Sequence, residues 1–188
     1  ADIKEMKARV EAELGQKARG NVKLGRGGIR EVEFLVQVLQ LINGGRDDRV
    51  RSRGSLPTLA RLVECGYLPA DEGAELAQAY RFLRNVEHKI QIVHQRQTHV
   101  IPKDALQQET LARRLGYHGA DVVARLWSDL DCHSERVRRA FEKLFYEPAA
   151  ETRRAVAPET AELLRNLDAR QPSVQRLREL GFAAPDTS

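Results

Sequence analysis

The amino-acid sequence predicts an all-α fold, an antiparallel bundle of about five main helices. Apolar residues recur every three or four positions in several long segments, which is the spacing of residues on one helix face. No long stretch alternates apolar and polar residues in the manner of a strand. Hydrophobic residues make up 41% and charged residues 31% of the 188 positions, a composition that fits one globular domain with an appendage.

Glycine and proline residues mark the ends of the expected helices. Gly20 and Gly44 each follow a segment with helical periodicity, and Pro148 follows the last long one. The segments 70–96 and 119–146 are the longest, so we expect them to form the centre of the bundle. The expected helices are 2–18, 29–43, 55–65, 70–96, 103–115 and 119–146, with two short ones near 159–168 and 172–180.

Two segments interrupt this helical pattern. Residues 21–24 form a short strand-like run, and Gly25 to Gly28 form a loop that is favourable because glycine tolerates positive φ. Residues 46–53 form a polar loop rich in arginine. This second loop either binds an acidic partner or nucleic acid, or it is only solvated surface, which is the simpler interpretation.

Charge, cysteine content and hydropathy narrow the class of protein. The formal net charge is +4, but acids and bases alternate closely along the chain, a pattern that tolerates nucleic acid without requiring it. No apolar run approaches the length of a membrane span, so no membrane partner is expected. Cys65 and Cys132 are isolated in the sequence, which suits a reducing cytoplasm.

The helix expected over 29–43 carries one acid on its apolar side. At 100° per residue, Glu33 falls beside Arg30 in a polar stripe, whereas Glu31 falls within the apolar arc. A carboxylate is unfavourable in a dry core, so Glu31 lies either in the open first turn of the helix or against another domain. The structural alternatives are an acid that stabilises the helix dipole and an Arg30–Glu33 pair at i,i+3.

The glycine loop before this helix predicts an anion site only weakly. Backbone N–H groups at the start of a helix can hold a phosphate, but no Gly-Lys-Ser/Thr sequence follows the loop here.

A resemblance to a known family rests on several motifs together. The run Asn21–Gln37, the stretches 44–46, 53–59 and 80–87, and the pair Gln97–Thr98 resemble bacterial glutamine synthetase adenylyltransferase/deadenylylase. The resemblance extends over about residues 1–146. The Arg-Glu-Val-Glu form of the motif is similar to the N-terminal, deadenylylating half of that enzyme.

The resemblance implies a domain organisation. Residues 1–28 would be the connecting helix, strand and glycine loop from the edge of a nucleotidyltransferase domain. Residues 29–147 would be a helical domain like that of the PII uridylyltransferase, and 148–188 would be short helices or a linker.

The paired acids typical of a nucleotidyltransferase are not recognisable in this sequence. Gly54-Ser55 is not followed by an acid-x-acid pair, and Asp129 and Asp131 point about 200° apart on a helix. We therefore expect the catalytic carboxylates outside this chain, and we expect the isolated chain to be inactive.

The resemblance also implies a site, cofactors and partners. The glycine loop would lie at the border of the catalytic cleft, where two acids act as tentative catalytic groups and the other residues bind nucleotide or phosphate. The acids are Glu31 and Glu33, and the binding residues are Lys23, Gly27, Gly28 and Arg30. The complete enzyme would use Mg²⁺ with ATP, ADP or phosphate, and the fragment itself holds no firm metal site. The expected partners are glutamine synthetase, the PII signalling protein and the missing nucleotidyltransferase domain.

Two alternatives remain open. The first is the helical domain of a PII uridylyltransferase, which shares a Gly-Gly-x-Arg-acid element, although the continuation Glu33–Gln37 argues against it. The second is a stand-alone helical module that binds protein or nucleic acid, for which no recognition-helix signature is present. The five histidines lack the spacing of a zinc site and are expected to pack or to lie at the surface.

Overall fold

The computed structural model describes residues 20–94 and 98–146 of the chain. Within these ranges it contains α-helices and one short 3₁₀ helix, and no strand. The elements are α2 (Ile29–Asn43), η1 (Asp48–Val50), α3 (Ser55–Glu64), α4 (Ala70–His94), α5 (Ala105–Arg114) and α6 (Val122–Tyr146). The predicted all-α fold class is therefore confirmed. The helices expected over 2–18, 159–168 and 172–180 lie outside the described residues.

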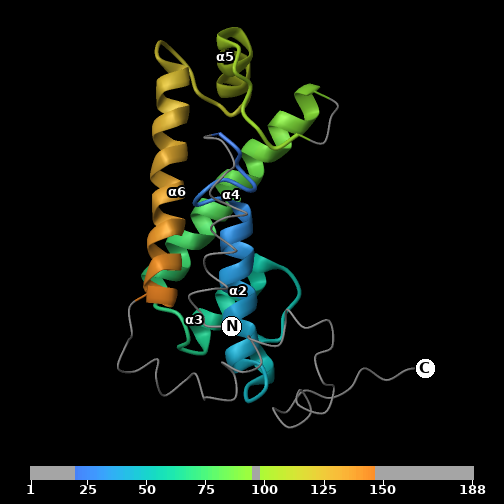
Figure 1. The fold of residues 1–188 in the computed structure, drawn as a ribbon, viewed down its shortest axis with the longest axis vertical. Helices are drawn as coiled ribbons and strands as arrows, with labels where there is room; N and C mark the ends of the chain where they lie inside the picture. The colour runs from blue at the N-terminus through green and yellow to red at the C-terminus, as the bar shows by residue number, and fades with distance from the viewer. Residues whose placement is uncertain (1–19, 95–97, 147–188) are drawn as a thin grey trace, which may run out of the picture.

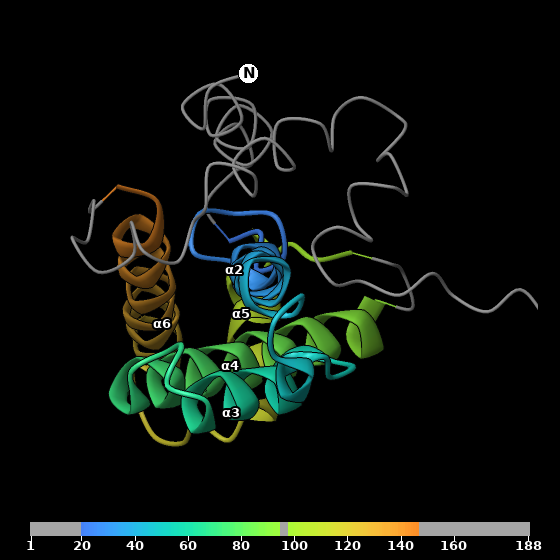
Figure 2. The same ribbon diagram turned by 90° about the horizontal axis from the view of Figure 1, so that it is seen from below.

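The two longest helices form the centre of the molecule. α4 crosses α6 and runs opposite in direction to both α6 and α2 (Figure 1). α2 lies over α4 with α6 to one side, as the view from below shows (Figure 2). α3 packs against α4 and α2, and α5 packs against α6 and α4. The amphipathic faces predicted for these segments therefore meet in one core.

The prediction of a strand over residues 21–24 was wrong. Backbone pairing is limited to one isolated antiparallel bridge between Asn21 and Val100. The Asn21 side chain folds the chain into a turn, because its Oδ1 accepts hydrogen bonds from the backbone N–H groups of Lys23 and Leu24 at 3.2 and 2.8 Å. An asparagine side chain that bonds its own backbone in this way competes with strand pairing.

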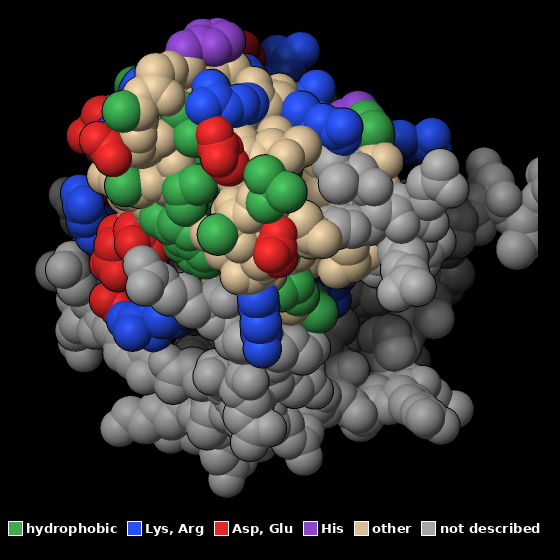
Figure 3. Space-filling model, turned by 90° about the horizontal axis from the view of Figure 1, so that it is seen from above, with side chains coloured by type: hydrophobic (Ala, Val, Ile, Leu, Met, Phe, Trp, Pro, Cys, Tyr) green, Lys and Arg blue, Asp and Glu red, His purple; other side chains and the backbone are tan. Residues whose placement is uncertain are grey.

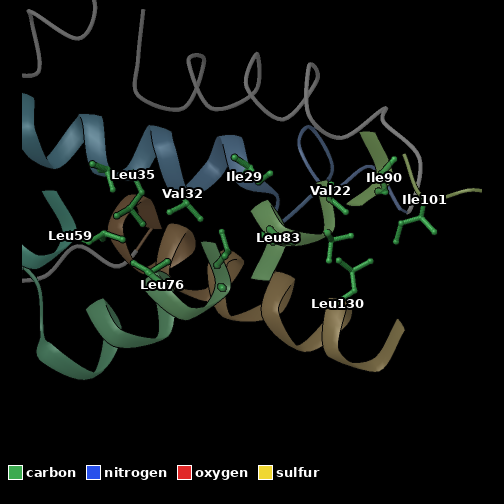
Figure 4. Packing of buried hydrophobic residues seen from close by; sticks show 14 of the residues in the cluster. Val22, Ile29, Val32, Leu35, Leu59, Leu76, Leu83, Ile90, Ile101 and Leu130 are labelled. Carbon is green, nitrogen blue, oxygen red and sulfur yellow. The ribbon is translucent and has the colours of Figure 1, made fainter. Parts of the chain in front are cut away.

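Residues 20–28, which we call the entry loop, are held in place before α2 begins. The Val22 N–H donates to the His99 carbonyl and the Ile101 N–H donates to the Gly20 carbonyl, both at 2.9 Å. Val22 is buried in the hydrophobic cluster together with Leu83 and Ile101 (Figure 4). The entry loop is thus fixed to the core and to the segment that precedes α5.

The arginine-rich loop after α2 is ordered by polar contacts. The Gln40 side chain donates to the carbonyls of Val50 and Ser52 at 2.8 and 3.0 Å. Arg49 binds Asp47 through two guanidinium nitrogens, at 2.8 and 2.6 Å, and hydrogen bonding from Arg49 lowers the pKa of Asp47. Arg49, one of the arginines of the loop that was considered for binding a partner, is therefore already paired with Asp47.

Candidate functional site

The start of α2 has few backbone N–H groups to offer an anion. The N–H groups of Ile29 and Arg30 donate to the carbonyls of Val22 and Lys23 at 3.0 and 3.1 Å. The next N–H, that of Glu31, donates back to the Gly28 carbonyl at 3.1 Å. The entry loop therefore caps α2 with its own carbonyls, and an anion bound here would rely mainly on side chains.

Two of the predicted site glycines permit close backbone approach. Gly27 has a φ of +69°, and a β-carbon on it would stand 2.1 Å from the Ser134 carbonyl oxygen of α6. A β-carbon on Gly28 would stand within 2.8 Å of the carbonyl oxygens of Gly25 and Lys23. Glycine at these positions lets the entry loop fold tightly and pack directly on the backbone of α6.

Glu31 is buried between α2 and α6. The residue is 1% exposed, so it lies on the apolar side of its helix as the 100° spacing predicted, and it is not in an open first turn. Its Oε1 lies 3.8 Å from a guanidinium nitrogen of Arg138, and its buried Oε2 has no hydrogen-bond partner. Burial raises the pKa of Glu31, while the Gly27 backbone and the charges of Arg138 and Arg26 act in the opposite direction.

Arg138 connects Glu31 to a second carboxylate nearer the surface. Its Nε donates to Glu142 at 2.6 Å, and Arg26 of the entry loop reaches the same Glu142 oxygen at 3.4 Å. Hydrogen bonding from Arg138 lowers the pKa of Glu142. A cavity of about 490 Å³ lies between the entry loop and α6, and Asn21, Arg26 and Arg138 are among its lining residues.

Lys23, a predicted phosphate ligand, lies elsewhere and contacts a buried acid of α4. Its Nζ is 3.5 Å from Oε1 of Glu87, whose side chain is 4% exposed. His99 Nδ1 lies 2.8 Å from the same oxygen, and Arg84 forms an ion pair with the other oxygen. One carboxylate therefore gathers side chains from α4, the entry loop and the segment before α5.

The remaining predicted residues, Arg30 and Glu33, are not paired with each other. Arg30 is exposed, and no Arg30–Glu33 ion pair forms, so the structural alternative of an i,i+3 pair is not realised. Glu33 instead accepts a hydrogen bond of 3.4 Å from the Tyr80 hydroxyl of α4. The six predicted site residues are thus neighbours along the chain, but their side chains lie in different surroundings.

Sequence reasoning missed Glu87, Arg84 and Arg138 as members of this region. Glu87 could have been found by the signal that singled out Glu31, because it follows Leu83 by four residues on the buried stripe of α4. A carboxylate on an apolar stripe needs a partner. The partners themselves come from distant segments and leave no spacing to recognise.

Metal ligation is not apparent in the part of the chain that the structure describes. No group of three or more His, Cys, Asp or Glu side chains within it could hold a metal ion, so these residues alone do not fit Mg²⁺. His133 stacks on Phe82 with ring centroids 4.5 Å apart, and burial lowers its pKa. None of the helices within the described ranges is long and apolar enough to cross a membrane.

Comparison with known proteins identifies the family. Residues 3–145 match the family described as GlnD PII-uridylyltransferase. A bifunctional glutamine synthetase adenylyltransferase/adenylyl-removing enzyme of Streptomyces avermitilis is 40% identical over 186 residues, which are 98% of this chain and 18% of that protein. Proteins of the same name from Nitrosococcus oceani and Hahella chejuensis are 38% identical over 187 residues and 42% identical over 154 residues.

The chain spans less than a fifth of the length of these relatives, covering 19% of the Nitrosococcus protein and 15% of the Hahella protein. The relationship predicted from the motifs is confirmed, because relatives of that name match nearly the whole chain. The chain belongs to the GlnD PII-uridylyltransferase family and is similar to one segment of the bifunctional adenylyltransferase/adenylyl-removing enzymes.

Proposed function

We propose that this chain is a helical domain of an enzyme that attaches AMP to glutamine synthetase and removes it. The observation that carries the proposal is the 38–40% identity over 98% of the chain to enzymes named for these two activities. The domain supports nucleotidyl transfer, and the paired acids that hold Mg²⁺ and ATP belong to a nucleotidyltransferase domain outside this chain. Glutamine synthetase is the substrate, the PII protein is a regulatory partner, and the enzyme works in the cytoplasm.

In the adenylyl-removing reaction, inorganic phosphate is the attacking group. A phosphate oxygen attacks the phosphorus of the AMP group and forms ADP, while the bond from phosphorus to the tyrosine oxygen breaks. The tyrosine oxygen leaves and takes up the proton that the attacking phosphate loses. Lys23 and Arg30 supply positive charge at the border of the cleft, where the negative charge of phosphate must be held. Gly28 allows the entry loop to turn tightly against the Lys23 carbonyl, and Gly27 allows the loop to pack on α6.

Glu31 supports a border with the catalytic domain. A buried carboxylate oxygen without a hydrogen-bond partner is rare in proteins, and its Oε2 is such an atom. Because Glu31 is buried, it acts on this border through its neighbours, the Gly27 backbone and Arg138. Glu31 and Glu33 would then lie at the edge of the cleft, where they orient the phosphate or the residues that bind it.

Replacing Glu31 tests this proposal in the complete enzyme. We expect Glu31→Gln to slow adenylyl removal about tenfold or more, which corresponds to about 1.4 kcal/mol of barrier, because it removes the charge and keeps the size. The measurement is the rate of ADP formation from adenylylated glutamine synthetase at saturating phosphate. Glu109→Gln, at an exposed ion pair with Arg113, is the matched control. If Glu31→Gln turns over at the unchanged rate, Glu31 has no role in the site.

A second candidate function is favoured by the description of the matching family. A helical domain of a PII uridylyltransferase would serve transfer of UMP to PII instead of transfer of AMP to glutamine synthetase. Assaying the complete enzyme with each acceptor protein separates the two.

The third candidate, a nucleic-acid-binding module, gains no support from the charge distribution. Acidic and basic side chains both occur across the face seen from above, so charge is not segregated on that face (Figure 3).

A further inference from the structure

Glu87 presents two cations on opposite oxygens of one carboxylate. Lys23 of the entry loop approaches Oε1 at 3.5 Å, and Arg84 of α4 pairs with Oε2. The two cations share a single negative charge, so one positive charge is left in excess. Two cations that share a carboxylate are also held close to each other, although they come from different segments.

The cations are accessible whereas the acid between them is not. The side chains of Lys23 and Arg84 are 32% and 50% exposed, and that of Glu87 is 4% exposed. An anion that approaches from solvent therefore meets the ammonium and guanidinium groups and not the carboxylate. A buried carboxylate with exposed cations favours an incoming oxyanion over an incoming cation.

Arg30 is joined to Lys23 through the backbone. The Arg30 N–H donates to the Lys23 carbonyl at 3.1 Å, which ties the first turn of α2 to Lys23. On the α4 side, Tyr80, Arg84 and Glu87 are spaced by four and three residues and share one face. Tyr80 contacts Glu33 of α2 and Glu87 contacts Lys23 of the entry loop, so the face of α4 that carries Arg84 borders both segments.

We propose that Arg84 is a further phosphate-binding residue, and that Glu87 is the positioning residue that presents Arg84 and Lys23 together. The ligand class is a phosphate oxyanion. A guanidinium group can donate two parallel hydrogen bonds to such an anion, while the lysine ammonium adds a compact charge. The assignment rests on the proposed function, in which inorganic phosphate is a substrate, and it adds α4 to a site otherwise built from the entry loop and α2.

The test is the phosphate dependence of adenylyl removal by the complete enzyme. We expect Arg84→Gln to raise the KM for phosphate fivefold or more and to change kcat less than twofold, because it removes a binding charge. Arg84→Lys, which keeps the charge, is expected to recover most of the affinity. Arg61→Gln is the matched control, because Arg61 is also exposed and also pairs with a glutamate three residues later on its helix.

A second comparison separates failure of this inference from failure of the proposed function. If Lys23→Gln raises the KM for phosphate and Arg84→Gln behaves like Arg61→Gln, the site stands without Arg84 and the inference is overturned. If neither Lys23→Gln nor Arg84→Gln changes that KM, the phosphate site itself is misplaced. Thermal unfolding of Arg84→Gln should match that of Arg61→Gln, and a large extra loss of stability would assign Arg84 a structural role instead.

Discussion

Gly27→Ala is expected to destabilise the domain by about 2–5 kcal/mol. A non-glycine residue at a φ of +69° is strained by about 1–2 kcal/mol. The new methyl group would also stand 2.1 Å from the Ser134 carbonyl oxygen, and such overpacking adds about 1–3 kcal/mol because the backbone of α6 must shift. Thermal or denaturant unfolding of the 188-residue chain measures the loss.

Trp127 makes this loss directly observable. It is the single tryptophan in the sequence, and one of its ring carbons lies 3.1 Å from the place of a β-carbon on Gly20, at the start of the entry loop. Gly66→Ala is the matched control, because Gly66 has a φ of +77° but no atom within 4 Å of the added carbon. It should lose only about 1–2 kcal/mol. Equal losses of stability for Gly27→Ala and Gly66→Ala would show that the entry loop does not pack on α6 as described.

Arg138→Met is expected to destabilise the domain by about 3 kcal/mol, because it leaves the Glu31 carboxylate buried without its nearest cation. The second partner of Arg138, Glu142, is 44% exposed and can be hydrated when the arginine is removed. Adding Glu31→Gln to Arg138→Met should therefore recover much of the stability. Arg139→Met, at the exposed neighbouring position, is the control and should change stability little. A double variant no more stable than Arg138→Met would contradict a pairing between these two side chains.

The loss caused by Arg138→Met should grow as the pH rises above 4.5. The pKa of Glu31 is raised above its unfolded value of 4.5, so the folded state holds this proton more tightly than the unfolded state does. The contribution of protonated Glu31 to the free energy of unfolding is therefore present below pH 4.5. It is lost as the pH rises through the pKa of the folded state. Removing Arg138 raises the folded pKa further and enlarges the loss. Denaturant unfolding at a series of pH values measures it, and a loss independent of pH would exclude an ionised Glu31 as its cause.

Local sequence patterns predicted the helices well because each helix has an apolar face and a clear stop. The helix predicted over 29–43 is α2, Ile29–Asn43, with Gly44 as its cap. The prediction of a strand over 21–24 was wrong because it rested on residue types alone. In the structure the Asn21 side chain bonds the backbone that follows it and folds it into a turn. The angular position of Glu31 predicted its place on the apolar arc, but not its burial beside Arg138 of α6.

The sequence by itself determined the helical class, the limits of the described helices to within about three residues, and the family, since all three are carried by local spacing and contiguous motifs. The tertiary structure decided which charges meet. Glu87 contacts Lys23, which is 64 positions earlier in the chain, and Arg138 reaches Glu31 from more than 100 positions away. Contacts at such separations depend on how α2, α4 and α6 cross, and helical periodicity fixes which face of a helix is buried without fixing what lies opposite it. Crossing geometry, not motif spacing, therefore placed Lys23 beside Glu87 of α4 and Glu31 beside Arg138 of α6.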